Sequence, residues 1–216
     1  MVIPTLGSLI YFVAYAGEPW AQITYVLVKI YTVVWPLVAT TMMLRERLAV
    51  PNLRAPHHRR AILPGLLIGG VLAAAGLALM EGPLGEAVIA QAEQIRLKVF
   101  QLGVLDHYLA FALFLSLVHS AIEEYYWRWF VFGTLRRLLS PQPAAVLSAL
   151  AFASHHVVIL SQYFPLPIAL LFGFAVALGG YMWCLMYERQ RSLVGVWVSH
   201  VILDLVIFWI GYRMLF

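Results

Sequence analysis

The sequence predicts an all-α protein that crosses a membrane several times, and three observations support this fold class. Hydrophobic residues make up 63% of the chain and charged residues only 11%, whereas about a quarter of a soluble domain is charged. Several apolar runs approach the ~20 residues that a helix needs to cross a bilayer. Basic residues gather in short loops between these runs, which is the positive-inside pattern, so the net charge of +4 does not indicate a nucleic-acid partner.

The first half of the chain contains three predicted spans. Val2–Ala16 is short, and is either a first span or a re-entrant helix. Ala21–Leu44 is the second span, in which Pro36 is expected to produce a kink. After the basic loop Arg45–Arg60 comes the third span, Ala61–Met80, whose glycines and alanines are spaced for close helix contact.

The next segment, Glu81–Asp106, has apolar residues at helical spacing among acidic ones, so we expect one amphipathic helix on the membrane surface. Four further spans are then predicted: His107–Leu135, Ala144–Leu160, Ile168–Tyr187 and Leu193–Tyr212. The expected architecture is therefore a bundle of about seven membrane-spanning helices plus one surface helix, forming a single integral-membrane domain over residues 1–216. Alternating spans place the basic loops on one side, with the N-terminus in the cytoplasm.

Ionisable residues inside the apolar runs are the main functional signal, because a charge in the bilayer is costly. Glu124 and Arg128 are four residues apart on a helix, so they stack on one face and are expected to form a supporting ion pair. Glu123 points roughly 100° away around the helix. We expect it to lack a fixed cation, and such a desolvated carboxylate suits a general base near neutral pH.

Two later spans supply possible partners for Glu123. One histidine of the pair His155 and His156 can face the bundle interior while the other faces elsewhere. We assign His156 to the site and expect only structural roles for His155 and His119. His200 and Asp204 share a helix face, so Asp204 could orient the imidazole ring or, if protonated, donate a hydrogen bond. A carboxylate, two histidines and an aspartate on three spans predict a shared polar cavity.

Three motifs in this order resemble the CPBP family, which comprises the type II CAAX prenyl proteases and the bacteriocin-processing or "Abi" proteins. They are E-E-x-x-x-R at Glu123–Arg128, F-x-x-x-H at Phe152–His156 and H-x-x-x-D at His200–Asp204. The similarity covers about Ser116–Val206. It implies that residues 107–212 form a catalytic core, while residues 1–106 contribute N-terminal spans and the amphipathic helix.

The resemblance implies an intramembrane glutamic endopeptidase that needs no metal or other cofactor. Glu123 would activate the attacking water with help from His156, while Glu124 and Arg128 would support the site. His200 and Asp204 would stabilise the oxyanion. Position 204 is commonly Asn in the CAAX proteases, and an ionised aspartate would repel an oxyanion. Asp204 would therefore be protonated or would act by holding His200.

The expected substrate is a membrane protein or peptide, such as a lipidated C-terminus, a bacteriocin leader or a C-terminal sorting tail. The expected location is the inner membrane of a bacterium. Three alternatives remain open at this stage. Glu123, His156 and His200 could bind zinc, although the H-E-x-x-H spacing is absent. A proton-coupled transporter could use the same residues as a relay, and a noncatalytic immunity or scaffold protein could share the fold.

Overall fold

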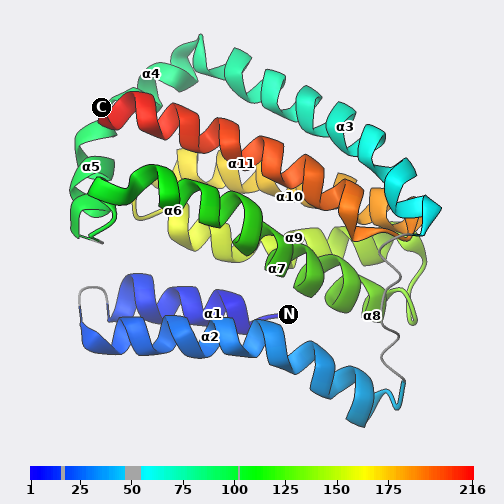
Figure 1. The fold of residues 1–216 in the computed structure, drawn as a ribbon. Helices are drawn as coiled ribbons and strands as arrows, with labels where there is room; N and C mark the ends of the chain where they lie inside the picture. Colours follow the sequence, from blue (N-terminus) through cyan, green and yellow to red (C-terminus); the bar gives the residue numbers. More distant parts are fainter. Residues whose placement is uncertain (16–17, 47–54, 102) are drawn as a thin grey trace. The chain divides into compact units, whose positions relative to one another are not determined.

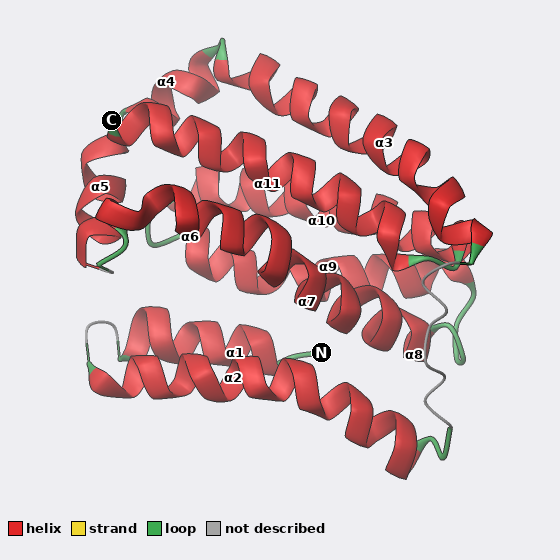
Figure 2. Cartoon of the chain, viewed as in Figure 1, coloured by secondary structure: helices red, strands yellow, loops and turns green. Residues whose placement is uncertain are grey.

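The computed structural model describes residues 1–15, 18–46, 55–101 and 103–216, and in these the regular secondary structure is helical, with no strand (Figure 2). The predicted all-α class is confirmed. Half of the predicted basic loop, residues 47–54, lies outside the described residues.

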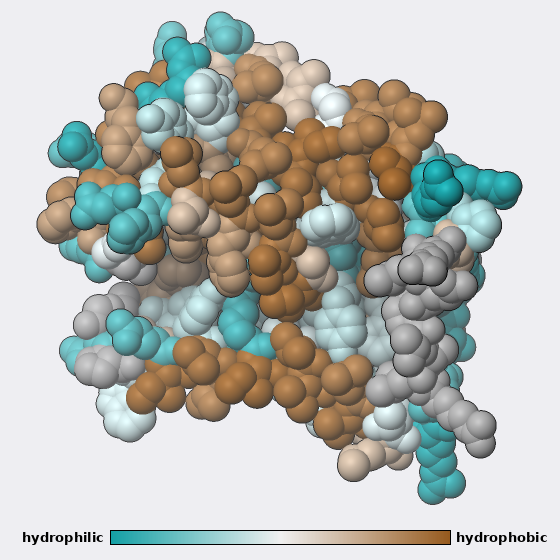
Figure 3. All heavy atoms as spheres, viewed as in Figure 1, coloured by the Kyte–Doolittle hydropathy of each residue, from teal (hydrophilic) through white to brown (hydrophobic). Residues whose placement is uncertain are grey.

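Six helices among the described residues are long and apolar enough to cross a membrane. They are Trp20–Met43, Pro56–Met80, Leu105–Leu135, Pro141–Leu160, Leu166–Gln190 and Leu193–Leu215. Large apolar side chains such as Leu67, Val71, Leu171 and Phe174 are exposed on them, and hydrophobic residues cover much of the face in Figure 3. Lipid takes the place of water against such surfaces. The chain is therefore an integral, multi-pass membrane protein.

Six of the seven predicted spans are present as long helices, and the first predicted span is not. Val2–Ala16 contains the short helix α1, Ile3–Leu9, which continues as a π-helical turn over Ile10–Ala14. This apolar helix is shorter than the ~20 residues needed for a crossing. The structure supports six spans rather than seven.

The predicted amphipathic helix is divided into two. Helix α4, Pro83–Ile89, and helix α5, Ala92–Gln101, are separated by a turn at residues 90–91. After the turn, Ile95 and Val99 of α5 pack against a small core of Tyr108, Ala112 and Leu215. A single helix was the wrong prediction because tertiary packing of α5 decides its direction, which periodicity does not encode.

The chain divides into two compact units. Unit 1 comprises Met1–Ala55 and Ile122–Arg191, and unit 2 comprises Pro56–Ala121 and Ser192–Phe216. This division differs from the expected division at residues 106 and 107, and the single membrane domain stays a prediction.

Unit 1 is built around the pair α9, Pro141–Leu160, and α10, Leu166–Gln190. Small residues let the two helices approach closely, because a Cβ atom at Gly180 would lie 3.1 Å from Phe152 Cδ1. Helix α1 packs both on α2, Pro19–Val38, and on α9. Figure 1 shows α1 side by side with α2. Thr5 and Ser154 join α1 to α9 through a hydrogen bond between their hydroxyls of 2.6 Å.

Unit 2 is built around α3, Pro56–Met80, which packs along α11, Leu193–Leu215 (Figure 1). The small residues of α3 form this contact, as their spacing predicts. A Cβ atom at Gly65 would lie only 2.3 Å from the carbonyl oxygen of Gly195, so the two backbones meet directly. At the start of α11, Ser192 Oγ accepts a hydrogen bond from the Val194 amide at 3.2 Å.

We predict that Gly65→Ala lowers the thermal stability of the purified protein, because the obstructing atom belongs to the backbone of α11 and cannot rotate away. The expected cost is about 1–3 kcal/mol, the usual range for overpacking. Gly70→Ala is the matched control, because an added Cβ there meets nothing within 4 Å. Thermal unfolding in detergent, followed by tryptophan fluorescence, should separate the two variants. Equal melting temperatures would show that α3 and α11 do not meet at Gly65.

Candidate active site

The first motif lies on a helix with an unusual backbone. Within Leu105–Leu135, the α-helical turn α7, Ser120–Glu124, stands between the π-helical segments Leu115–His119 and Tyr125–Phe132. π-Helical turns are rare and occur frequently at functional sites. Ser148 of α9 donates a hydrogen bond of 3.3 Å to the Trp127 carbonyl in the second π-helical segment. Glu123 and Glu124 are the last two residues of the short α-helical turn, directly before the second π-helical segment.

The predicted pair of Glu124 and Arg128 is present. Arg128 Nε lies 3.1 Å from Glu124 Oε2, and each side chain is 1% exposed. The guanidinium carbon also lies 4.4 Å from the ring centroid of Phe152 and 4.9 Å from that of Trp183. These rings come from α9 and α10, so one cation joins three helices through an ion pair and two cation–π contacts.

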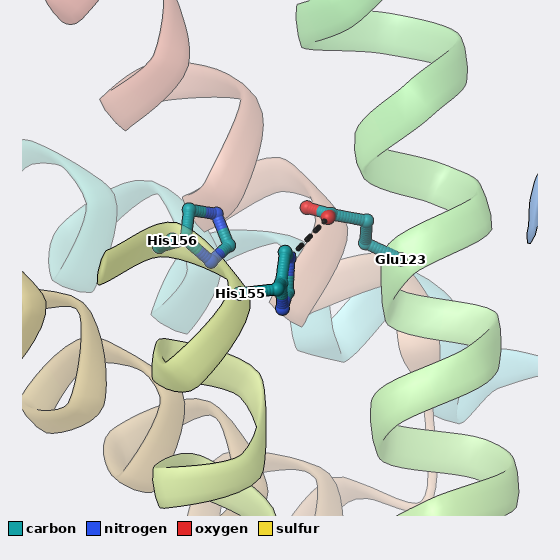
Figure 4. A group of neighbouring side chains, drawn as sticks. All are labelled: Glu123, His155 and His156. Atoms are coloured by element: carbon teal, nitrogen blue, oxygen red, sulfur yellow. Dashed lines mark hydrogen bonds and ion pairs between the residues drawn. The ribbon is translucent and has the colours of Figure 1, made fainter. Parts of the chain in front are cut away.

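Glu123 meets both histidines of α9 (Figure 4). His155 Nε2 lies 3.4 Å from Glu123 Oε1, a long hydrogen bond between buried groups. One ligand atom from each of Glu123, His155 and His156 lies within 4.8 Å of the others. His155, for which only a structural role was expected, therefore lies at Glu123 together with His156. Its ring stacks on Trp127, with centroids 5.6 Å apart and planes 3° apart, while its Nε2 faces Glu123.

His156 also stays close to the site, and its backbone contact defines its tautomer. Its Nδ1 lies 3.0 Å from the carbonyl oxygen of Phe152. Since a carbonyl oxygen only accepts hydrogen bonds, Nδ1 carries the proton of the neutral ring and Nε2 keeps a lone pair. Phe152 itself packs edge-on against His156, with ring centroids 4.6 Å apart. The phenylalanine of the second motif therefore contacts both the arginine brace and the histidines.

A cavity of about 30 Å³ adjoins Glu123, which is room for at least one water molecule. Its walls come from α1, α2, the helix of the first motif and α9, all within unit 1. The lining residues are Pro4, Ser8, Tyr11, Val28, Lys29, Thr32, Ile122, Glu123, Tyr126, Trp127 and His155. A carboxylate, an imidazole and hydroxyl groups therefore surround a water-sized space.

Lys29 is the residue of this cavity that the sequence reasoning missed. It lies in α2, and its charge is near enough to interact with that of Glu123. The structure thus places a lysine at the cavity of Glu123, for which the sequence analysis expected no fixed cation. A signal was present, because Lys29 is the sole charged residue between Trp20 and Met43. An intramembrane lysine marks a functional site by default.

The third motif lies in unit 2. His200 is buried, and its Nε2 lies 3.6 Å from Asp204 Oδ1 on the same face of α11. The predicted contact between these two side chains is confirmed. That they meet Glu123 in one cavity stays a prediction, as does the packing role of His119.

The donor atoms that unit 1 brings together can be compared with those that a metal ion requires. Zinc accepts histidine nitrogens and carboxylate oxygens. Glu123, His155 and His156 form a group of three possible ligands, whereas the sequence suggested Glu123, His156 and His200. The Nε2 lone pair of His156 suits a metal ligand. The residues of unit 1 therefore fit either a hydrogen-bonded water or a metal-bound one.

Arg128→Met should lower the melting temperature strongly, because it leaves the Glu124 carboxylate buried without its arginine. Breaking one partner of a buried pair costs about 3–5 kcal/mol. Arg137→Met is a suitable control, since Arg137 pairs with the exposed Glu46 outside the spans. Scanning fluorimetry in detergent should show a large shift for Arg128→Met and almost none for Arg137→Met. Similar shifts would contradict the bracing role of Arg128.

The three motifs fall inside a region that matches a known family. Residues 105–206 match the family described as "Type II CAAX prenyl endopeptidase Rce1-like". This confirms the resemblance seen over Ser116–Val206, and it leaves α1, α2 and α3 outside the match. Comparisons with curated proteins and with solved structures found no match.

Proposed function

We propose that this chain, which carries an Rce1-like type II CAAX prenyl endopeptidase domain at residues 105–206, is a glutamic intramembrane endopeptidase. The family implies CAAX intramembrane protease activity. The proposed reaction is hydrolysis of a peptide bond near the membrane-embedded or C-terminal end of a substrate. One observation supports the mechanism: Glu123 and His155 line a water-sized cavity in unit 1, and His156 offers a ligand atom within 4.8 Å of theirs.

Glu123 is the proposed general base. A water in the cavity would lose a proton to the Glu123 carboxylate while its oxygen attacks the carbonyl carbon of the peptide bond. The carbonyl oxygen then carries the negative charge of the tetrahedral intermediate. As the C–N bond breaks, Glu123 returns the proton to the leaving nitrogen. Products are a carboxylic acid and an amine, and Glu123 is regenerated as a carboxylate.

The two histidines of α9 have different proposed tasks. His155 contacts the Glu123 carboxylate and would hold its orientation. His156 has its Nδ1 proton directed at a backbone carbonyl, so its Nε2 lone pair can accept a hydrogen bond from the attacking water. This assignment adds His155 to the histidine that the family motif implies.

His200 and Asp204 are proposed to stabilise the oxyanion. Donors aimed at the developing charge supply much of the stabilisation in acyl-transfer reactions. His200 can donate from a ring nitrogen, and its contact with Asp204 at 3.6 Å would orient the ring. Asp204 acts here as the partner of His200 or as a protonated donor, because an ionised carboxylate would oppose the oxyanion.

The substrate is proposed to be a membrane protein or peptide whose cleavage site enters the bilayer. A lipidated C-terminus fits the family, and a C-terminal sorting tail or a bacteriocin leader is also compatible with a site inside the membrane. A location in a bacterial inner membrane belongs to the same proposal.

Glu123→Gln should abolish cleavage of a fluorogenic farnesylated peptide ending in a C-a-a-X sequence. The amide keeps the size of the side chain but cannot accept the proton from water, and loss of a general base typically costs ~10²–10⁴-fold in rate. Glu86→Gln in α4 applies the same substitution outside the spans and should leave the rate unchanged. Cleavage that survives Glu123→Gln would refute the glutamic mechanism.

A zinc-dependent reaction is the second candidate, because Glu123, His155 and His156 form a possible ligand group. The metal-free mechanism predicts that protein purified without added metal contains far less than one zinc per chain. It also predicts that a chelator leaves peptide cleavage intact. Elemental analysis measures the first quantity. Stoichiometric zinc that is lost in both His155→Ala and His156→Ala would favour the metal mechanism instead.

A further inference from the structure

Lys29 places a basic group in the middle of a span that the family match does not cover. It is the sole charged residue between Trp20 and Met43, and helix α2 precedes the matched region, residues 105–206. Placing a lysine at such a depth in a bilayer is unfavourable unless the side chain reaches an acid, a polar cavity or the interface. Its surroundings therefore indicate what compensates this cost.

The surroundings of Lys29 are the cavity at Glu123. Lys29 lines that cavity, and Glu123 is the sole carboxylate among the residues lining it. Both side chains therefore border the same water-sized space. The Lys29 ammonium also lies 5.3 Å from the ring centroid of Tyr25, one helical turn earlier, which adds a cation–π contact. The ammonium thus sits between an aromatic ring and the cavity that holds Glu123.

The backbone around Lys29 is anchored to the helix of Glu123. The Tyr125 hydroxyl donates a hydrogen bond of 3.1 Å to the Val33 carbonyl, one turn after Lys29. Tyr31 of α2 packs against Tyr126, with ring centroids 6.3 Å apart. Thr32 donates to the Lys29 carbonyl at 2.8 Å. The contacts of Tyr125 and Tyr126 keep α2 in place beside the helix of Glu123 without using the Lys29 side chain.

Other titratable groups also face Glu123. Tyr11 approaches from the π-helical turn Ile10–Ala14 and Tyr25 from α2, and His155 and His156 approach from α9. A tyrosine with its ordinary pKa is neutral at neutral pH. The ordinary pKa of lysine is far higher than that of histidine. Of these described neighbours, Lys29 is therefore the group expected to carry a positive charge at neutral pH.

We propose that Lys29 is a positioning residue for the reaction: its ammonium pairs with the Glu123 carboxylate at the cavity, and so keeps the base charged and directed at the water. This inference rests on the proposed function, because it assumes that Glu123 is the base. A base must be present as its anion to accept a proton, and a nearby cation favours the anion. The N-terminal helices would then complete the active site.

Three variants test this role. Lys29→Met removes the charge and keeps the length of the side chain, whereas Lys29→Arg keeps the charge. Lys98→Met is the matched control, since Lys98 belongs to α5 and is no part of the cavity. On the farnesylated peptide, Lys29→Met should lower kcat by about tenfold or more, with little change in KM. Lys29→Arg should restore most of the rate, and Lys98→Met should match the wild type.

Infrared spectroscopy tests the pairing of Lys29 with Glu123 without an activity measurement, because it reports whether the Glu123 carboxyl group is ionised. The difference between the infrared spectra of the wild type and of Glu123→Gln identifies the absorption band of the Glu123 carboxyl group. At neutral pH the wild type should show an ionised carboxylate, and Lys29→Met should show a protonated carboxyl group in its place. An ionised Glu123 in Lys29→Met, or a kcat equal to that of Lys98→Met, would overturn the proposal.

A double-mutant cycle on thermal stability gives a second measurement independent of activity. Glu123→Gln should change the melting temperature differently in the wild type and in Lys29→Met, because paired side chains are not additive. Additive effects would show that the two charges are not paired. If the wild type fails to cleave the peptide, or Glu123→Gln still cleaves it, the proposed function fails instead. The infrared spectra and the cycle still decide whether Lys29 pairs with Glu123.

Discussion

The buried contact between Glu124 and Arg128 is the interaction on which the candidate site depends. A guanidinium in the bilayer must have a counterion, and here it also lies against Phe152 of α9 and Trp183 of α10. Loss of either partner would leave a buried charge uncompensated, so the three helices are held in one arrangement. Because Phe152 also contacts His156, the brace carries the second motif into place beside the first.

Glu123 owes its position to its neighbour. With Glu124 directed at Arg128, the side chain one residue earlier is turned away from the brace and toward the cavity lined by α1 and α2. The two adjacent glutamates therefore have different roles, one structural and one chemical. One neutralises a structural cation between helices, while the other faces a polar space that can hold water. The N-terminal helices matter here because they supply part of the wall of this cavity.

The fold class and six of the spans could be predicted because length and apolar composition are sufficient for a crossing helix. The pairing of Glu124 with Arg128 and of His200 with Asp204 was also predictable, since four residues along a helix bring two side chains onto one face. Gly65 and Gly69 of α3 were interpreted correctly for a similar local reason, whereas an added Cβ at Gly70 or Gly76 would meet nothing within 4 Å. By contrast, the short helix at Ile3–Leu9 and the turn between α4 and α5 depend on packing with distant segments.

The site residues that were misjudged show where local reasoning ends. Adjacent histidines start about 100° apart on a helix, which suggested that one must face away from Glu123. Stacking on Trp127 nevertheless brings the His155 ring to Glu123, while His156 remains close enough to join the same group. Lys29 was overlooked although its charge was visible, because no motif accompanies it. A charged residue in a span needs a partner, and identifying that partner requires knowing which helices touch. For Lys29, the contacts of α2 with Tyr125 and Tyr126 show that α2 touches the helix of Glu123.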